Sequence, residues 1–230
     1  MFAISKRGNS AVRAAAFLSV VVTAGITPPA AAIEVETIVE NASARYDELT
    51  DFSAGLWLIT TSAFIEQETV LKGRLYSRKP NRFRIEYYYP SDQTVVFDGT
   101  TLYFYNPATN QVVIYPVEGI TGDETVESVF EAAETRYDFE DDGEVTLSGE
   151  YKTYKLKMTA KSSSATYPTV WAWIDAEEWV ARRVDLYDYD GNVTSYRLFV
   201  FKYNQGYGSG KFVFEIPDGA EVIRAEELAF

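Results

Sequence analysis

The spacing of apolar residues along the chain changes from a helical period to a strand period. Between residues 34 and 49 the apolar side chains recur every three or four positions, which is typical of one face of an α-helix. Beyond this segment apolar and polar residues alternate, most clearly over residues 82–87. Successive side chains of a strand point to opposite faces, so Phe83, Ile85 and Tyr87 are predicted to share one face while the charged residues between them occupy the other.

Turn-forming residues divide the rest of the chain into short strands. Groups that contain Gly, Pro or Asn separate the alternating segments, and such groups favour tight turns. They are Lys79-Pro80-Asn81, Asp98-Gly99, Asn106-Pro107, Asp142-Gly143 and Asp190-Gly191. The pattern predicts a mainly β fold in which about eleven short strands form an antiparallel meander, with two helical segments added.

The second helical segment interrupts the run of strands at Thr121. Thr121 and Glu124 have the spacing of a capping box, in which the Thr side chain caps the helix and the Glu side chain reaches back. The apolar residues that follow form a single stripe at helical spacing: Val126, Val129, Phe130 and Ala133. This stripe fits either an ordinary core helix that covers one face of the sheet or a movable lid over an apolar cavity.

The N-terminal segment is predicted to be a secretory signal peptide of residues 1–32. Basic residues precede an apolar stretch at residues 14–25, and small residues follow up to Ala32, near which we expect cleavage. The alternative, an N-terminal membrane anchor, is disfavoured because the apolar stretch is shorter than the ~20 residues that a spanning helix needs. Residues 33–230 would then form a single exported domain.

Composition narrows the classes of function. Removal of the signal takes away three positive charges and no negative ones, so the net charge falls from −13 to −16. Such a chain repels nucleic acid and anionic membranes, so neither is an expected partner. The chain has no His and no Cys, which excludes disulfides, ordinary zinc sites and nucleophiles activated by His. Most hydrolytic chemistry is thereby excluded, although composition still allows hydrolysis by paired carboxylates.

Two acidic segments suggest cation binding at first sight. The segment at 188–192 is similar to a calcium loop, but Leu186 and Arg197 occupy the first and last ligand positions. We interpret Asp190-Gly191 as a hairpin turn and the acidic run at 140–144 as a solvated turn.

Three motif blocks carry a resemblance to a known family. They are Gly73 to Phe83 with Pro90 beyond it, Asp98 to Pro107, and Phe212 to Val222. In order and spacing these blocks resemble the outer-membrane lipoprotein carrier protein (LolA) family of periplasmic lipoprotein chaperones. The signal peptide, the opening helix and the mid-chain helix also fall where that family has them, so the resemblance covers nearly the whole mature chain.

This resemblance implies a fold and a function together. The fold would be a strongly curved antiparallel sheet, an incomplete or half barrel, whose open side is covered by helices. Its apolar interior would hold the acyl chains of lipoproteins that an ABC-type transporter releases from the inner membrane. The carrier would then deliver these acylated lipoproteins to an acceptor at the outer membrane. The family has no enzyme activity or cofactor, and we expect a monomer.

Candidate site residues also follow from the resemblance. Phe83 holds a motif position on the predicted apolar face, so we expect Phe83→Glu to weaken cargo handling with little loss of folding. The candidates for the wall of the acyl-chain cavity are Phe83, Ile85, Tyr87, Leu102, Phe104, Trp171 and Trp173. The candidates for the lid are Val126, Val129 and Phe130. The family commonly has an Arg before the motif Pro that latches the lid, whereas Lys79 stands here after Arg78, and either residue is a candidate for the latch.

Two other classes of function stay open. A protein of the same fold can serve as a sensing module that binds lipids or lipoproteins and signals through a partner, although such regulators usually carry a further domain. A lipid-modifying hydrolase is disfavoured because His and Cys are absent.

Overall fold

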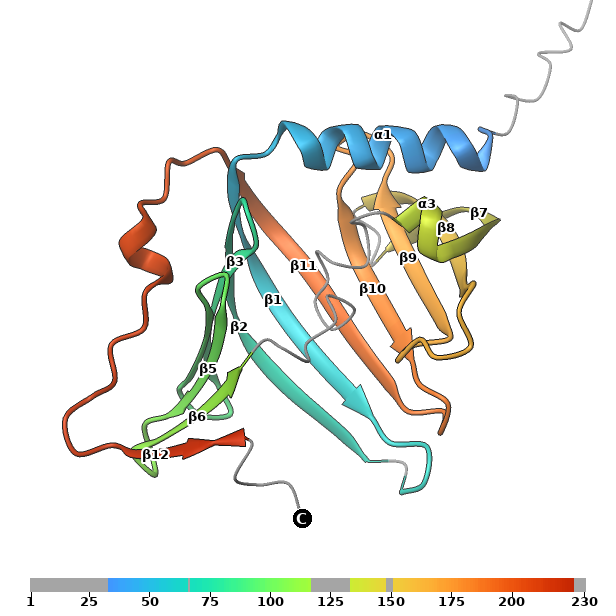
Figure 1. Ribbon diagram of the computed structural model, residues 1–230. Coiled ribbons are helices and arrows are strands. Elements are labelled where there is room, and N and C mark those ends of the chain that lie inside the picture. Colours follow the sequence, from blue (N-terminus) through green and yellow to red (C-terminus); the bar gives the residue numbers. More distant parts are fainter. Residues whose placement is uncertain (1–32, 66, 117–132, 148–150, 226–230) are drawn as a thin grey trace, which may run out of the picture. The chain divides into compact units, whose positions relative to one another are not determined.

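The alternating segments of the chain pair into one sheet of twelve strands. A computed structural model describes residues 33–65, 67–116, 133–147 and 151–225 (Figure 1). The strands are β1 (Asp51–Thr61), β2 (Glu68–Arg78), β3 (Arg82–Tyr89), β4 (Gln93–Phe97), β5 (Thr101–Asn106), β6 (Gln111–Pro116), β7 (Tyr137–Leu147), β8 (Tyr151–Ala160), β9 (Thr169–Asp175), β10 (Ala181–Tyr187), β11 (Val193–Tyr203) and β12 (Glu221–Arg224). The described helices are α1 (Val35–Glu48), the short α3 (Ala133–Arg136) and the 3₁₀ turn η2 (Ser209–Phe212). None of these described helices is long and apolar enough to cross a membrane.

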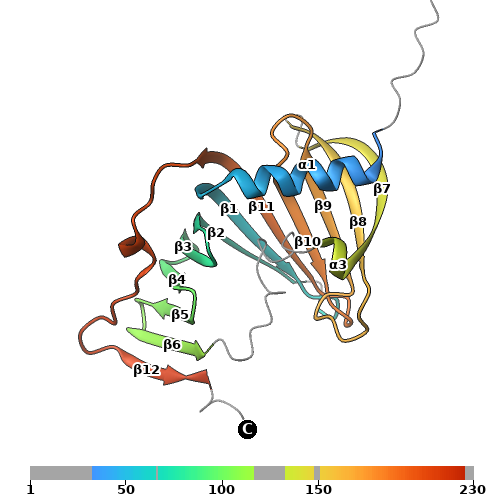
Figure 2. The ribbon, with the colours of Figure 1, turned by 45° about the horizontal axis from the view of Figure 1, so that its top comes forward.

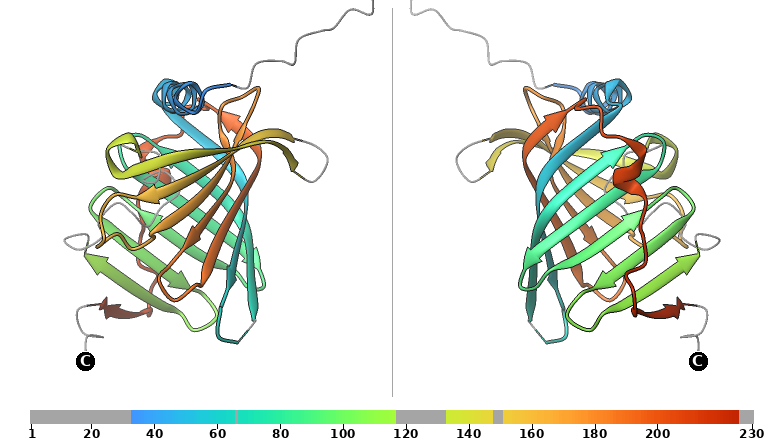
Figure 3. Two further views of the ribbon diagram at one scale, coloured as in Figure 1. Left: turned by 90° about the vertical axis from the view of Figure 1, so that its right-hand side faces the viewer. Right: turned by 90° about the vertical axis from the view of Figure 1, so that its left-hand side faces the viewer.

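The strand order places the first strand beside the last long one. The order is β12-β6-β5-β4-β3-β2-β1-β11-β10-β9-β8-β7. β1 to β6 form one meander and β7 to β11 another, and antiparallel pairing of β1 with β11 joins the two. Within the described residues β7 and β12 each pair with one neighbour only, so the sheet stays open. Figures 2 and 3 show that it curves into a half-barrel-like trough.

Helix α1 packs on the concave face of this trough. Its buried residues Ile38 and Val39 lie in a core with residues of β8, β9 and β10, such as Met158 and Val170. Figures 1 and 2 show the helix crossing one end of these strands. A second buried core covers the concave face of β1 to β3 and includes Leu49, which follows α1 directly. The helix therefore connects the two halves of the concave core.

The C-terminal segment covers part of the convex face. Residues 204–220, here called the strap, lead from β11 along the outside of the sheet to β12, which pairs in parallel with β6 (Figure 3). Phe214 of the strap stacks on Tyr103 with ring centroids 5.2 Å apart, and Tyr207 meets Tyr76 at 5.5 Å. The side chain of Phe212 is buried. The strap thus covers part of the convex side of the β2 to β6 half of the sheet, around Tyr76 and Tyr103.

Most of the predicted elements are present in the described residues. The helix at 34–49 is confirmed as α1, and the alternation at 82–87 is confirmed as part of β3. The sheet has twelve strands rather than about eleven, and β12 departs from the antiparallel meander. The predicted helix from Thr121 to residue 132 lies outside the described residues, which contain only the four-residue α3 at its end. Among the described helices, α1 alone is therefore seen to cover the open side of the sheet.

The prediction of a turn at Asp142-Gly143 is wrong. Both residues lie inside β7, where a bulge shifts the register between Asp141 and Glu144. Gly143 has a φ of 89°, and its N–H donates a hydrogen bond of 2.8 Å to the Asp141 carboxylate. A bulge and a hairpin turn both favour a Gly in the left-handed conformation, so an Asp-Gly pair in the sequence is compatible with either.

The acidic run at 140–144 is correspondingly part of a strand rather than a turn. Its carboxylates form ion pairs with lysines of the neighbouring β8: Glu140 with Lys157, Asp142 with Lys155, and Glu144 with Lys152. Exposed pairs of this kind each contribute little to stability. Their charges do, however, mark the edge strand of the sheet, where they discourage pairing with a strand of another molecule.

Candidate functional site: an apolar concave face

Strand register places five of the seven wall candidates together on the concave face. Phe97 of β4 lies opposite both Phe83 and Leu102, and Val95 lies opposite both Ile85 and Phe104. Directly opposed residues of antiparallel strands point to the same side of the sheet. The five candidates on this face are Phe83, Ile85, Tyr87, Leu102 and Phe104.

These five residues lie at two depths. Phe83 and Tyr87 are buried, at 8% and 6% exposure, and the Phe83 ring packs 5.6 Å from the ring of Phe97. Burial raises the pKa of Tyr87 to about 12, so its phenol stays neutral at physiological pH. Ile85, Leu102 and Phe104 are only half-buried. The buried pair therefore forms the floor of the concave face, and the half-buried residues form the surface that a ligand can reach.

Trp171 and Trp173 lie on the opposite, convex face. In the register of β8, β9 and β10, Trp173 is flanked by Lys155 and Arg183, and all of them point away from the concave core. The Lys155 ammonium lies 4.0 Å from the centre of the Trp171 ring, and the Arg183 guanidinium lies 4.4 Å from that of Trp173. The concave positions of β9 belong instead to smaller side chains such as Ala172. These two tryptophans therefore do not line the concave face.

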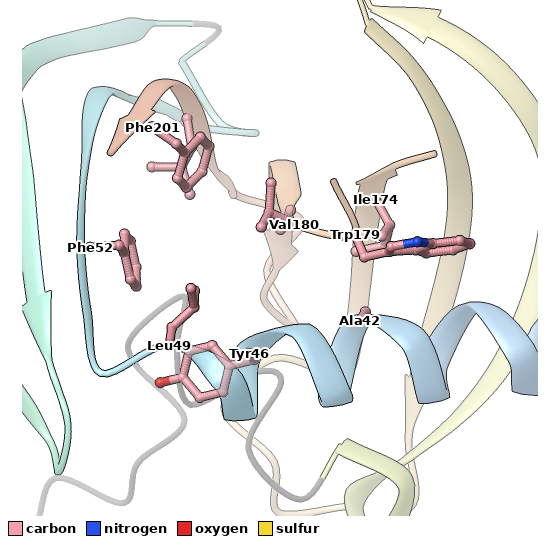
Figure 4. A pocket seen from close by; sticks show the side chains of 10 residues that line it. Ala42, Tyr46, Leu49, Phe52, Ile174, Trp179, Val180 and Phe201 are labelled. Carbon is pink, nitrogen blue, oxygen red and sulfur yellow. The ribbon is translucent and has the colours of Figure 1, made fainter. Parts of the chain in front are cut away.

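An apolar pocket opens between the end of α1 and the strands (Figure 4). Its volume is about 60 Å³. The lining residues come from α1, β1, β9, β10 and β11 and the segments beside them: Ala42, Tyr46, Leu49, Phe52, Ile174, Trp179, Val180, Ala181, Leu198 and Phe201. Phe52 and Leu49 belong to the same core as Ile85 and Leu102, so the pocket continues into the half-buried concave surface.

Sequence reasoning missed this pocket for identifiable reasons. The α1 stripe that predicts the helix already contains Ala42, whose small side chain leaves room between the helix and the sheet. Trp179 and Phe201 give no periodic signal because each lies at a break in strand geometry. Trp179 has a φ of 57° between two strands, and Val200, just before Phe201, has a φ of 51°.

Lys79 fastens the end of α1 over this pocket. Its Nζ donates a hydrogen bond of 2.6 Å to the backbone carbonyl of Tyr46, and it lies 4.2 Å from the centre of the Tyr46 ring and 3.6 Å from the Asp47 carboxylate. The Tyr46 carbonyl also accepts a hydrogen bond of 3.1 Å from the Leu49 N–H, and the partial negative charge at the end of a helix favours an ammonium group beside it. Arg78 instead lies opposite Arg82 on the convex face. Of the two latch candidates, Lys79 thus contacts a helix, and that helix is α1.

A buried ion pair holds the β9–β10 turn that carries Trp179. The Asp175 carboxylate accepts hydrogen bonds from the backbone N–H groups of Glu177 and Glu178 and from Arg182 Nε at 2.8 Å. Burial alone would raise the pKa of Asp175, but these hydrogen bonds and the guanidinium charge outweigh it, so the pKa is lowered. Arg182 also pairs with Glu178 at 3.1 Å. The Tyr203 hydroxyl donates to Glu178 in turn, and burial followed by this carboxylate raises the pKa of Tyr203.

The concave site offers hydrophobic contact rather than reactive groups. The lid candidates Val126, Val129 and Phe130 lie outside the described residues. Within the described ranges there is no group of three or more acidic side chains placed to hold a metal ion. What the described residues bring together is an apolar pocket, a half-buried apolar surface beside it and one cationic contact at the helix end.

Comparison with known proteins identifies the family. The family model described as outer membrane lipoprotein carrier protein LolA matches residues 60–215. The chain belongs to the LolA family. An outer-membrane lipoprotein carrier protein of Methylobacillus flagellatus is 23% identical over 188 residues, which are 80% of this chain and 88% of that LolA family protein. One from Actinobacillus pleuropneumoniae is 26% identical over 178 residues, or 77% and 79% of the two chains.

Solved structures share the fold of this LolA family chain. An uncharacterized conserved protein from Thermus thermophilus superposes with a TM-score of 0.55 at 21% identity, covering 82% of this chain and 98% of that one. Mycobacterium tuberculosis lipoprotein LppX superposes with a TM-score of 0.50 at 12% identity, covering 76% of this chain and all of that one. At such low identity these likenesses concern the open, curved sheet alone.

Proposed function

We propose that the protein is a periplasmic carrier of acylated lipoproteins. It receives them from an ABC-type transporter in the inner membrane, shelters their acyl chains on its concave face and delivers them to an acceptor at the outer membrane. The observation that carries this proposal is the apolar pocket beneath α1, at the point where Lys79 fastens the helix. Membership of the LolA family and the names of the curated relatives support it.

Hydrophobic energetics make such shelter necessary. Each methylene group kept from water is worth about 0.8 kcal/mol, so a protein with several acyl chains needs an escort through an aqueous compartment. A pocket of about 60 Å³ takes only the end of such a chain. The remainder lies over the half-buried concave residues Ile85, Leu102 and Phe104. An open trough also lets cargo leave without unfolding of the sheet.

The helix end is the part of the site that moves in this proposal. The side chain of Lys79 is 34% exposed, so water competes for its contact with Tyr46. Release of that contact lifts the last turn of α1 while Ile38 and Val39 stay buried. Cargo therefore enters beneath the C-terminal end of the helix, between Tyr46 and the β9–β10 turn.

Filling the pocket tests this function directly. Ala42 lines the pocket, whereas Ala44 is exposed on the same helix, so Ala42→Trp and Ala44→Trp form a matched pair. The full chain and both variants are expressed in a Gram-negative host, purified from the periplasm and analysed for bound molecules by mass spectrometry. We expect wild type and Ala44→Trp to recover acylated lipoproteins, and Ala42→Trp to recover about tenfold less, equivalent to about 1.4 kcal/mol of binding.

Other outcomes of this experiment point elsewhere. Recovery of phospholipid without lipoprotein would overturn the cargo assignment, and equal recovery by Ala42→Trp would exclude the pocket as the site. Circular dichroism of each variant checks that the fold is retained. Lipoprotein that stays bound and is not transferred to outer-membrane vesicles would favour the second candidate, a module that senses lipoproteins.

A further inference from the structure

A row of cationic and aromatic side chains crosses the convex face of the sheet. Strand register aligns one residue from each of seven neighbouring strands at the same level. In spatial order these strands are β3, β2, β1, β11, β10, β9 and β8. In spatial order these residues, here called the cation–aromatic row, are Tyr89, Lys72, Trp57, Arg197, Arg183, Trp173 and Lys155. With strands about 4.8 Å apart, the row is roughly 29 Å long.

The aromatic rings of the row hold its cations in place. Lys72 Nζ lies 4.6 Å from the centre of the Trp57 ring and 5.3 Å from that of Tyr89. The Arg183 guanidinium lies 4.4 Å from the centre of the Trp173 ring. Such contacts position a cation without neutralising its charge. The row therefore presents ordered positive charge toward solvent.

Folding does not account for this arrangement. Arg183 and Arg197 are directly opposed on the same face, and like charges in that relation destabilise a sheet. Arg183 is offset by Asp185 at 2.5 Å. Arg197, by contrast, is exposed, and neither it nor Lys72 has a carboxylate within ion-pair distance among the described residues. Two uncompensated cations thus stand in a row that crosses a protein of net charge −13.

We propose that the cation–aromatic row is a docking surface for an acidic segment of a partner protein. Complementary charge is the first reason, because Lys72 and Arg197 provide free positive charge beside exposed aromatic surface on Trp57 and Tyr89. Shape is the second reason. The row runs as a line over a convex surface, which an extended chain can follow and a flat bilayer meets only locally. The strap leaves this part of the convex face uncovered, since its contacts lie on Tyr76, Tyr103 and their neighbours.

This docking surface is separate from the concave site and does not depend on the carrier function. The row and the pocket lie on opposite faces of the same strands, because Trp57 and Arg197 alternate with Leu56 and Leu198 of the concave core. A partner bound to the row therefore leaves the concave face free to hold a ligand.

An acidic peptide tests the proposal. A fluorescein-labelled peptide of ten glutamates is titrated with the purified full chain at low salt, and binding is followed by anisotropy. The variant Lys72→Glu/Arg197→Glu changes the row, and Arg224→Glu changes an exposed charge on β12 away from it. We expect saturable binding that the double variant weakens at least about tenfold and Arg224→Glu less than about twofold, with affinity falling as salt rises.

Three results would overturn the proposal. They are absence of saturable binding by the wild-type chain, an equal loss with Arg224→Glu, and binding to phosphatidylglycerol vesicles in place of the peptide. Circular dichroism and urea unfolding of the double variant show whether it folds. If it does not, the single variant Arg197→Glu carries the test, since its side chain is exposed and forms no ion pair with the described residues.

Discussion

The ammonium group of Lys79 lies 2.6 Å from the backbone carbonyl oxygen of Tyr46 and joins the β2–β3 turn to the last turn of α1. The two ends of the helix are held differently. Ile38 and Val39, near its start, are buried in the core on β8 to β10, whereas its end is held by this contact, by buried Leu49 and by the Arg45 guanidinium, 4.6 Å from the centre of the Tyr203 ring. We therefore expect the C-terminal end of the helix to separate from the sheet more readily than its start.

Removal of the Lys79 ammonium group should loosen that end of α1. Lys79→Met keeps most of the apolar stem and removes the hydrogen bond, so we expect the free energy of unfolding to fall by about 1 kcal/mol. Hydrogen exchange at the amides of residues 43–48 should become faster, while the amides in the first turns keep their protection. Arg78→Met, on the convex face, is the control and should leave this exchange unchanged. Equal protection of the helix end in Lys79→Met would show that Lys79 does not hold it.

The sequence allowed the face of some residues to be predicted but not of others. Phe83 and Ile85 alternate with charged residues, so only one face of β3 is apolar and its direction follows. Trp171 and Trp173 alternate with apolar residues as well, because both faces of β9 are covered: one by the core, the other by the aliphatic and cationic side chains of Lys155 and its neighbours. A period of two then separates the faces without showing which is concave.

Contacts between distant segments were beyond sequence reasoning for a related reason. The strap covers part of the convex face through Phe212 and Phe214, whose alternation in sequence is the same as that of a strand. Lys79 meets Tyr46 from 33 positions away, and only the folded trough brings them together. Local pattern fixes periodicity, whereas these contacts depend on the curvature of the sheet.

Burial changes the expectation for Phe83. At 8% exposure and in contact with Phe97, it belongs to the folded core as well as to the candidate wall. Phe83→Ala should therefore lower the free energy of unfolding by about 3–5 kcal/mol, and Phe83→Glu by more because it buries a charge. Tyr88→Ala, at an exposed neighbouring position, should change it by less than about 0.5 kcal/mol. Urea unfolding measures all three, and a stable Phe83→Glu would mean that this side chain faces an open cavity.

Close packing of β2 against β3 explains why the first motif block has Gly at position 73. A Cβ built on Gly73 would lie 2.5 Å from the backbone oxygen of Glu86 and 3.0 Å from the Tyr87 Cα, so β2 and β3 must separate to admit it. Gly73→Ala should cost about 1–3 kcal/mol of unfolding free energy. Gly208→Ala in the strap is the control, because nothing lies within 4 Å of its Cβ position and its φ of −64° suits any residue. A loss of stability as large in the control as in Gly73→Ala would remove this explanation.

The Asp175–Arg182 pair makes the free energy of unfolding depend on pH in the acidic range. Asp175 is 5% exposed and its pKa is lowered from the ordinary value of 3.8, because hydrogen bonds and Arg182 outweigh the burial that would raise it. A lowered folded-state pKa gives stability that is complete above the unfolded-state value and is lost as the pH falls through the folded-state value. This contribution therefore persists through neutral pH and disappears only below about pH 3.8.

Asp175→Asn isolates this contribution. It leaves the Arg182 guanidinium with Glu178 as its remaining carboxylate, so we expect a loss of about 3 kcal/mol in unfolding free energy at about pH 7. The difference between wild type and Asp175→Asn should shrink at about pH 3, because there the unfolded wild-type chain binds a proton on Asp175 that the folded chain resists. Asp190→Asn, in the exposed β10–β11 turn, supplies the matched control and should follow wild type at both pH values. Because protonation and substitution remove the same charge, a difference that stays constant with pH would mean that Asp175 stabilises the turn through its shape and neutral hydrogen bonds rather than through its charge.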